Sequence, residues 1–159
     1  MRINENQAAE MKKPLLLKDL GNVLKYLQGI KNESEITVHG DWSLNQNLAH
    51  CAQSIEFAMS GYPIEKPRLF QNTIGTLVFH YFDWKGFMRH GTNQFIPGEM
   101  PLSDDSTIDG LSALEEVINK FEDWDKPLFP HRFYGRLNKK QYARAHVLHI
   151  ANHLELIDF

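Results

Sequence analysis

Hydrophobic positions recur at three- and four-residue steps along most of this chain, the spacing that gathers apolar side chains on one face of an α-helix. Sustained alternation of apolar and polar residues, which would predict a half-buried strand, is missing from the sequence. The pattern therefore predicts an all-α fold. Helices are expected over residues 15–30, 43–60, 68–87, 106–124 and 138–159.

Residues that start and stop helices stand at several of these boundaries. Ser43 is placed to cap the second helix, and Gly61 is placed to end it. Asn138 and Gln141 have the spacing of a capping box at the start of the last helix. These residues sharpen the expected boundaries of the second and last helices.

The third helix has the most aromatic pattern in the chain. Because its large side chains recur at helical spacing, we expect them to face inward and make this helix the heaviest packing element. The residues concerned are Phe70, Ile74, Leu77, Tyr81, Trp84 and Met88. After this helix, residues 86–105 carry glycine, proline and polar residues with little periodicity, which predicts a loop of the kind that is often functional.

Composition and charge narrow the class of protein. The 159 residues, 42% of them hydrophobic, suffice for one domain over residues 1–159, with residues 1–13 as a flexible tail. The net charge of -3 and the scattered 17 basic residues exclude the basic stripe of a nucleic-acid binder. No apolar run is long enough for a membrane span or a signal peptide, and the single Cys51 fits a reducing compartment, so a cytoplasmic location is expected.

Histidines give the last helix its candidate chemistry. Tyr142, His146, His149 and His153 share one stripe of that helix, on the side away from its charged residues. Unpartnered imidazoles are costly to bury, whereas one divalent ion satisfies several of them and keeps them neutral. His149 and His153, four residues apart, can hold one ion from the same helix face.

A three-ligand site needs another residue from a second helix. His50, with Asn47 and Ser54 beside it on the second helix, is the first candidate, and His80 on the third helix is the second. From the residues alone, a hydrogen-bonded core histidine explains His50 more simply than a ligand does. Cys51 lies on an apolar stripe and is expected to be a buried thiol that takes no part in chemistry.

The motifs resemble those of the DinB-like (DinB/YfiT) superfamily of metalloenzymes. That superfamily has a Leu-x-His motif on helix two and a His-x-x-x-His pair on the last long helix. A branch of it adds Ala-His-x-x-x-Ser-Ile-Glu, Gly-x-Pro, Pro-Gly and Pro-His-x-Phe-x-Gly-x-Leu motifs. This sequence matches them at Leu48–His50, Ala49–Glu56, Gly61–Pro63, Pro97–Gly98, Pro130–Leu137 and His149–His153.

The resemblance implies a four-helix bundle with an up-down-down-up course, a long central loop and an accessory helical segment. It also implies that His50, His149 and His153 bind nickel or zinc with positions left open for water. Members with known activities use low-molecular-weight thiols, which suggests a small-molecule substrate of this kind. Where the branch often has paired histidines, this chain has Asn152 before His153.

Three functions follow as hypotheses. In a metal-dependent enzyme, His146 could hydrogen-bond to a metal ligand or act as a general base, and Tyr142 or His131 could orient substrate, although His131 is equally suited to packing. In a binding module, the metal would only tie helices together, and in a purely structural bundle the histidines would bond to one another and to water. A homodimer is also expected to be feasible through Phe87, Phe95 and Trp124.

Overall fold

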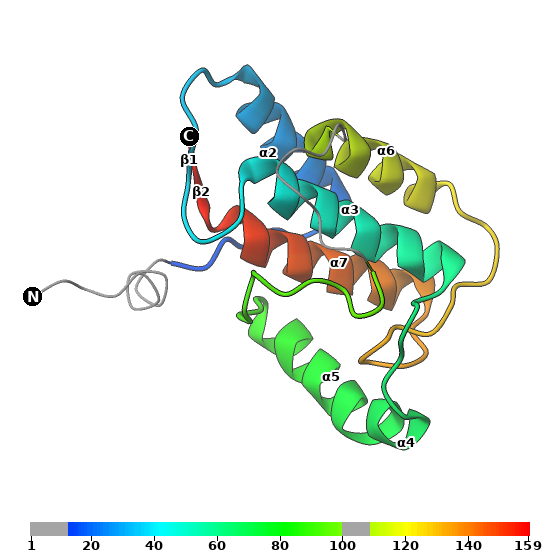
Figure 1. Ribbon diagram of the computed structural model, residues 1–159. Helices are drawn as coiled ribbons and strands as arrows, with labels where there is room; N and C mark the ends of the chain where they lie inside the picture. The colour runs from blue at the N-terminus through cyan, green and yellow to red at the C-terminus, as the bar shows by residue number, and fades with distance from the viewer. Residues whose placement is uncertain (1–12, 100–108) are drawn as a thin grey trace, which may run out of the picture.

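The computed structural model describes residues 13–99 and 109–159, which are mostly helical, as the all-α prediction requires (Figure 1). The exception is a pair of two-residue antiparallel strands that joins the segment after the first described helix to the C-terminus. The elements in chain order are α2 (Leu20–Asn32), β1 (Thr37–Val38), α3 (Leu44–Ser60), α4 (Arg68–Phe70), the π-helix η1 (Gln71–Gly75), α5 (Thr76–Lys85), α6 (Gly110–Glu122), α7 (Lys139–Leu154) and β2 (Ile157–Asp158).

The main hydrophobic core lies between α2, α3, α6 and α7 (Figure 1). Each of these helices contributes fully buried aliphatic side chains, among them Leu27, Ile55, Ile118 and Leu154. Helix α3 packs against both α6 and α7. The contact between α3 and α7 matters most for function, because it sets the second helix of the predicted metal site beside the last one.

The predicted caps of α3 and α7 are confirmed. Ser43 and Gln46 form a capping box at the start of α3, and Asn138 and Gln141 form the same motif at the start of α7. Gly61 ends α3 in a conformation with φ of 96°, which glycine adopts without strain. These local bonds fix where the two histidine-bearing helices begin.

Three predicted helix boundaries are wrong. Helix α2 begins at Leu20 rather than near residue 15, because the Asp19 carboxylate accepts a hydrogen bond from the Asn22 backbone N–H and caps the helix there. Helix α7 ends at Leu154, since the chain beyond it pairs with β1 as a strand. Helix α6 begins at Gly110 rather than at residue 106, because Asp109 caps it, and residues 106–108 lie outside the described residues.

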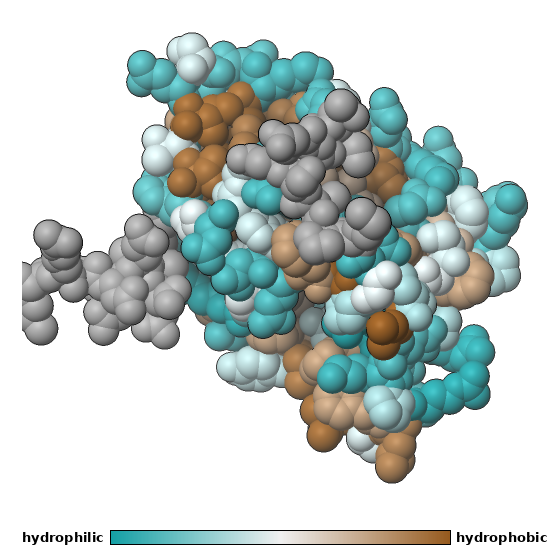
Figure 2. Space-filling view, in the orientation of Figure 1, coloured by the Kyte–Doolittle hydropathy of each residue, from teal (hydrophilic) through white to brown (hydrophobic). Residues whose placement is uncertain are grey.

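The inward face predicted for the third helix is wrong at four of its six residues, whereas Phe70 is half-buried and Met88, just beyond the helix, is buried. Helix spans residues 68–85 as expected, but Ile74, Leu77, Tyr81 and Trp84 are exposed, the last to 83%. Figure 2 shows hydrophobic side chains gathered along the lower edge of the molecule, where α4 and α5 lie in Figure 1. The periodicity was sufficient to predict the helix but not its orientation.

Contacts on the other side of this helix explain its orientation. The buried Gln71 side chain donates hydrogen bonds from Nε2 to the carbonyl oxygens of His131 and Arg132. Gly75 approaches the chain so closely that an added Cβ would overlap the carbonyl oxygen of Phe133. Phe79 continues this face into a smaller core cluster with α7. The three inward residues are four apart along the chain, the spacing that puts side chains on one face of a helix.

The segment after α5 has no helix or strand from residue 87 to residue 99, as the predicted loop requires. The remainder of that loop, residues 100–105, and nearly all of the predicted tail lie outside the described residues. In the described chain, no helix has both the length and the apolar character needed to cross a lipid bilayer.

Candidate metal centre

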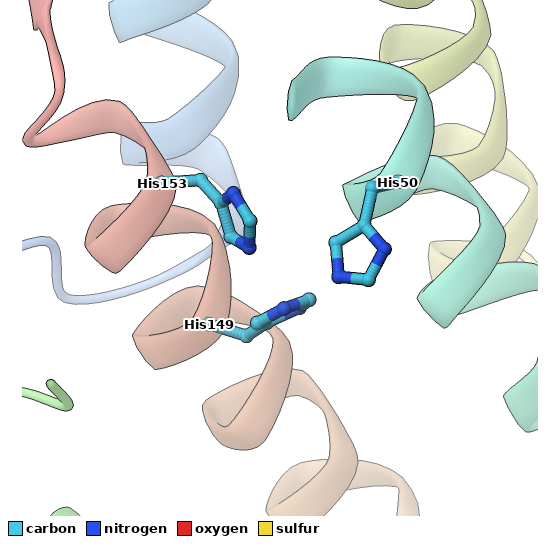
Figure 3. Close-up of side chains that lie close together, drawn as sticks. All are labelled: His50, His149 and His153. Carbon is cyan, nitrogen blue, oxygen red and sulfur yellow. The ribbon is translucent and has the colours of Figure 1, made fainter. Parts of the chain in front are cut away.

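Three histidines from α3 and α7 come together in the interior, as predicted (Figure 3). His50 on α3 faces His149 and His153 on α7, and one ring nitrogen of each lies within 4.8 Å of the others. His50 and His153 are buried, and His149 is half-buried. No carboxylate or thiolate joins this group within the described residues, so the cluster offers three imidazole nitrogens that could hold a metal ion.

Asn47 orients the ring of His153. The Asn47 amide nitrogen donates to the carbonyl oxygens of Trp42 and Ser43, at 3.2 and 2.9 Å, so its Oδ1 is the acceptor toward His153. The Nδ1–H of His153 therefore donates to Asn47 Oδ1 at 2.8 Å. This tautomer leaves the lone pair of His153 Nε2 free, and that buried nitrogen has no hydrogen-bond partner among the described residues.

Ser54 has the same role for His149. Its hydroxyl donates to the carbonyl oxygen of Cys51 at 2.8 Å, so its oxygen is left to accept from His149 Nδ1, 3.2 Å away. The hydrogen on Nδ1 again leaves Nε2 of His149 with a lone pair. Metal-binding histidines are usually held in this way by a hydrogen bond to the other ring nitrogen.

Burial keeps the three rings neutral. It lowers the pKa of His50 to about 4, with a further contribution from the nearby His90. Burial first, and then the neighbouring histidines, lower the pKa of His149 and His153 well below the usual 6.5. Near pH 7 all three imidazoles therefore present lone pairs, which suit zinc, nickel, copper or iron better than magnesium or calcium.

The hydrogen bonding of the ring nitrogens shows whether a metal ion fits this cluster. A buried imidazole nitrogen without a partner costs free energy, and His153 Nε2 is such an atom. A divalent ion bound by Nε2 of His153 and the facing nitrogens of His50 and His149 would satisfy it. The orienting bonds from Asn47 and Ser54 point to the same use, so the residues present fit a three-histidine metal site.

A fourth histidine, His90, stands at the exposed side of the cluster and was missed in the sequence. Its ring stacks on His149, with centroids 5.4 Å apart and planes at 19°. Its Nδ1 donates to the Gly91 carbonyl oxygen at 2.7 Å, which leaves Nε2 as an acceptor. The buried Asn152 side chain donates to the His90 carbonyl oxygen and holds the loop there.

Trp42 and Phe95 form an aromatic wall beside the cluster. The Trp42 ring lies 5.1 Å from the His50 ring and 6.1 Å from the His153 ring, centroid to centroid. Phe95 packs on Trp42 at 4.8 Å. Trp42 lies just before a predicted helix and Phe95 lies in the predicted loop, so helical periodicity could not identify either residue. Asn47 and Ser54, by contrast, stand at helical spacing from His50 and were noted beside it in the sequence, but their bonds to His153 and His149 depend on how α3 and α7 pack.

The other candidate residues of the last helix lie apart from the exposed side of the cluster. His146 is packed edge-on against Phe121 and stacked on Tyr142, and its Nε2 has no partner among the described residues. The Tyr142 hydroxyl donates to the Phe129 carbonyl oxygen at 2.7 Å. Both side chains are buried, so a catalytic role for them stays a prediction that these contacts do not test.

His131 makes several contacts that hold the loop before α7 together. Its Nδ1 accepts hydrogen bonds from the backbone N–H groups of Phe133 and Tyr134, and its ring stacks on the Tyr134 ring at 4.4 Å. Burial lowers its pKa to about 3. These contacts give His131 a clear packing function, and a role in orienting substrate likewise stays a prediction.

Two further candidates are placed outside the site. His80, the second choice for a third ligand, is exposed on α5 and does not belong to the cluster. Cys51 is fully buried, as expected of a structural thiol, and burial raises its pKa.

Comparison with known proteins gives a family but no characterised relative. No curated protein and no solved structure matches the chain. A family described as a protein of unknown function, DUF1569, matches residues 9–158, which include every residue of the histidine cluster. Since this match covers nearly the whole sequence, the chain belongs to the DUF1569 family.

Proposed function

We propose that this protein is a metal-dependent enzyme that holds one zinc or nickel ion through His50, His149 and His153. The observation that carries the proposal is the cluster itself: three neutral imidazoles face one another, and the buried Nε2 of His153 has no other partner in the described chain. Three protein ligands with further positions open are typical of catalytic rather than structural zinc sites.

The surroundings support chemistry on a small molecule. When bound, such an ion supplies Lewis acidity and lowers the pKa of a coordinated water toward about 7. Asn47 and Ser54 orient the ligand rings, and Trp42 and Phe95 shield one side of the cluster from water. The exposed His90 offers a hydrogen-bond acceptor on the side where substrate would enter.

The reaction class rests on the resemblance of the motifs to DinB-like proteins. It supports a hydrolase or a transferase that uses a low-molecular-weight thiol as co-substrate. The same resemblance supports a four-helix bundle with an up-down-down-up course. In such an enzyme, the candidates for proton transfer and substrate orientation remain His146, Tyr142 and His131.

A non-catalytic binding protein is the second candidate. The ligands come from α3 and α7, so a bound ion would join two helices of the main core and stabilise them. Under this alternative the ion would have no exchangeable position. Substrate chemistry would then be absent even in fully loaded protein.

The first test is metal content. We would purify the protein without a histidine tag and measure bound metal by elemental mass spectrometry. About one equivalent is expected in the wild type, and His50→Ala, His149→Ala and His153→Ala should each lose it. His80→Ala, at an exposed position outside the cluster, is the matched control and should keep it. Wild-type protein that takes up no metal after reconstitution would refute the site.

The second test separates the two functions. Cobalt-loaded protein should change its visible absorption spectrum when azide or acetohydroxamate is added, because an open position accepts an exogenous ligand. Loaded protein should then turn over ester or thiol-transfer substrates, whereas His153→Ala should not. A spectrum that no added ligand alters would favour the non-catalytic alternative.

A further inference from the structure

A row of large apolar side chains runs along the outside of the helix formed by α4, η1 and α5. Exposed fractions along it range from 52% to 83%, and no described part of the chain covers it. Figure 2 shows hydrophobic side chains at the lower edge of the molecule, where α4 and α5 lie in Figure 1. We call it the α5 stripe, and its members are Leu69, Ile74, Leu77, Tyr81 and Trp84.

The α5 stripe cannot turn inward, because the opposite face of the same helix is anchored. Gln71 donates hydrogen bonds to two backbone carbonyls of the 131–135 turn, and Gly75 lies against the backbone of Phe133. On α5, the Asp83 carboxylate accepts from Arg144 Nε at 2.9 Å. The exposed orientation is therefore a property of the folded chain.

We propose that the α5 stripe is the surface through which two copies of this chain associate, with their α5 helices antiparallel about a two-fold axis at Leu77. In such an interface, a residue that contacts a second residue of the partner is matched by the reverse pair, and only a residue on the axis meets its own copy. Ile74 and Tyr81 lie three and four residues from Leu77, one helical turn on either side. Leu69 and Trp84 lie eight and seven residues away, two turns on either side.

The sizes of the side chains complement one another under this symmetry. Leu77 meets the partner's Leu77, Ile74 meets the partner's Tyr81, and Leu69 meets the partner's Trp84. Every contact away from the axis thus joins one aromatic and one aliphatic side chain.

The exposed area of the α5 stripe is close to the area that a stable interface with a second copy would bury. Tyrosine and tryptophan bury about 150–250 Å² each in an interface, and Trp84 alone is 83% exposed. With three aliphatic side chains added, the stripe approaches the roughly 800 Å² per partner of a standard protein interface. Exposed apolar patches of this size on a monomer normally mark an interaction surface.

The α5 stripe differs from the surface suggested by the sequence. Phe87, Phe95 and Trp124 are all partly buried, and Phe95 is packed against Trp42 beside the histidine cluster. The proposed interface contains none of them. It also lies outside the metal site, so the failure of either proposal leaves the other standing.

Sedimentation equilibrium over a concentration series provides the first test. The wild type is expected to form dimers, and Leu77→Glu should raise the dissociation constant at least about tenfold, because it places two like charges on the axis. Leu16→Glu is the matched control. Leu16 is 64% exposed and lies far from the stripe along the chain, so this variant should dimerise as the wild type does. Circular dichroism checks that both variants are folded.

Cross-linking tests the symmetry. Leu77→Cys should form a disulfide-linked dimer under mild oxidation, because a residue on the axis meets itself. Trp84→Cys alone should not cross-link, whereas a mixture of Leu69→Cys and Trp84→Cys chains should. The buried Cys51 is not accessible for this reaction.

Three outcomes would overturn the proposal. A wild type that is monomeric throughout the series would do so, as would a dimer that Leu77→Glu leaves unchanged. Binding of monomers to phosphatidylcholine–phosphatidylserine vesicles, lost in Leu77→Glu, would assign the stripe to a lipid surface instead.

Discussion

Asn47 and Ser54 show how single residues on α3 prepare the histidines on α7. Each accepts a hydrogen bond from Nδ1 of one histidine, and each uses its own donor on a backbone carbonyl oxygen of α3 or the segment before it. The two side chains therefore fix the tautomer of the rings as well as their direction. Hydrogen bonds of this kind prepare histidine rings to bind a metal ion.

Replacing Ser54 with alanine tests this arrangement. Ser54→Ala should weaken zinc binding about 10- to 100-fold while leaving all three ligands in place, because His149 loses the acceptor that orients it. Competition with a chromophoric chelator measures the affinity. Ser60→Ala is the matched control: its hydroxyl also donates to a carbonyl of α3, that of Glu56, but contacts no histidine. Equal affinities for the two variants would contradict the role of Ser54.

At the scale of elements, the helix from Arg68 to Lys85 is the one whose local pattern and tertiary position disagree. Its apolar residues have the spacing of a buried face, and yet the buried face is built from Gln71, Gly75 and Phe79. Backbone approach at Gly75 decides the matter, because only a residue without a side chain fits against the Phe133 carbonyl.

Gly75→Ala measures the strength of that contact. An alanine at this helical position would gain up to about 1 kcal/mol in helix propensity. Its Cβ would overlap backbone that cannot simply rotate away, and overpacking of this kind costs about 1–3 kcal/mol. A net loss of about 1–2 kcal/mol in the free energy of unfolding is expected from urea denaturation. Gly91→Ala, where the nearest atoms lie 3.7 Å away, should change it by less than about 0.5 kcal/mol. A stabilised Gly75→Ala would contradict the account.

At the scale of the whole molecule, buried histidines link stability to pH. Burial lowers the pKa of His50 to about 4, and of His131 and His146 to about 3. In the unfolded chain such groups take up protons near pH 6.5, so the unfolded state binds more protons than the folded state between these values. The free energy of unfolding is therefore expected to fall as pH decreases from about 6.5 toward 3.

The variant His146→Leu tests the contribution of one of these histidines to the pH dependence of stability. With metal removed by a chelator, acidification should lower the free energy of unfolding of the wild type. The expected loss is about 1.4 kcal/mol per pH unit for each histidine that is neutral in the folded chain and protonated in the unfolded chain. His146→Leu removes one such group, so its stability should fall less steeply between pH 6 and pH 4, as measured by urea denaturation at a series of pH values. Identical slopes in variant and wild type would show that His146 is not neutral in the fold.

Much of the fold could be predicted from the sequence, because helix formation depends on interactions between residues close in the chain. Three- and four-residue periodicity located the helices, and the Ser43 and Asn138 motifs fixed two helix starts. The start of α2 at Leu20 and the end of α7 at Leu154 were missed. The first depends on a cap at Asp19, and the second on a strand pairing with residues far away in the chain.

Within the site, the sequence determined the pair His149 and His153, since residues four apart on a helix must share a face. Only the tertiary structure brought His50 to them and placed His90 on the exposed side, because both depend on how distant segments pack. The outward direction of the α5 stripe was decided in the same way. Periodicity shows that a helix has an apolar face, but the competition of all segments for one interior decides which face is buried.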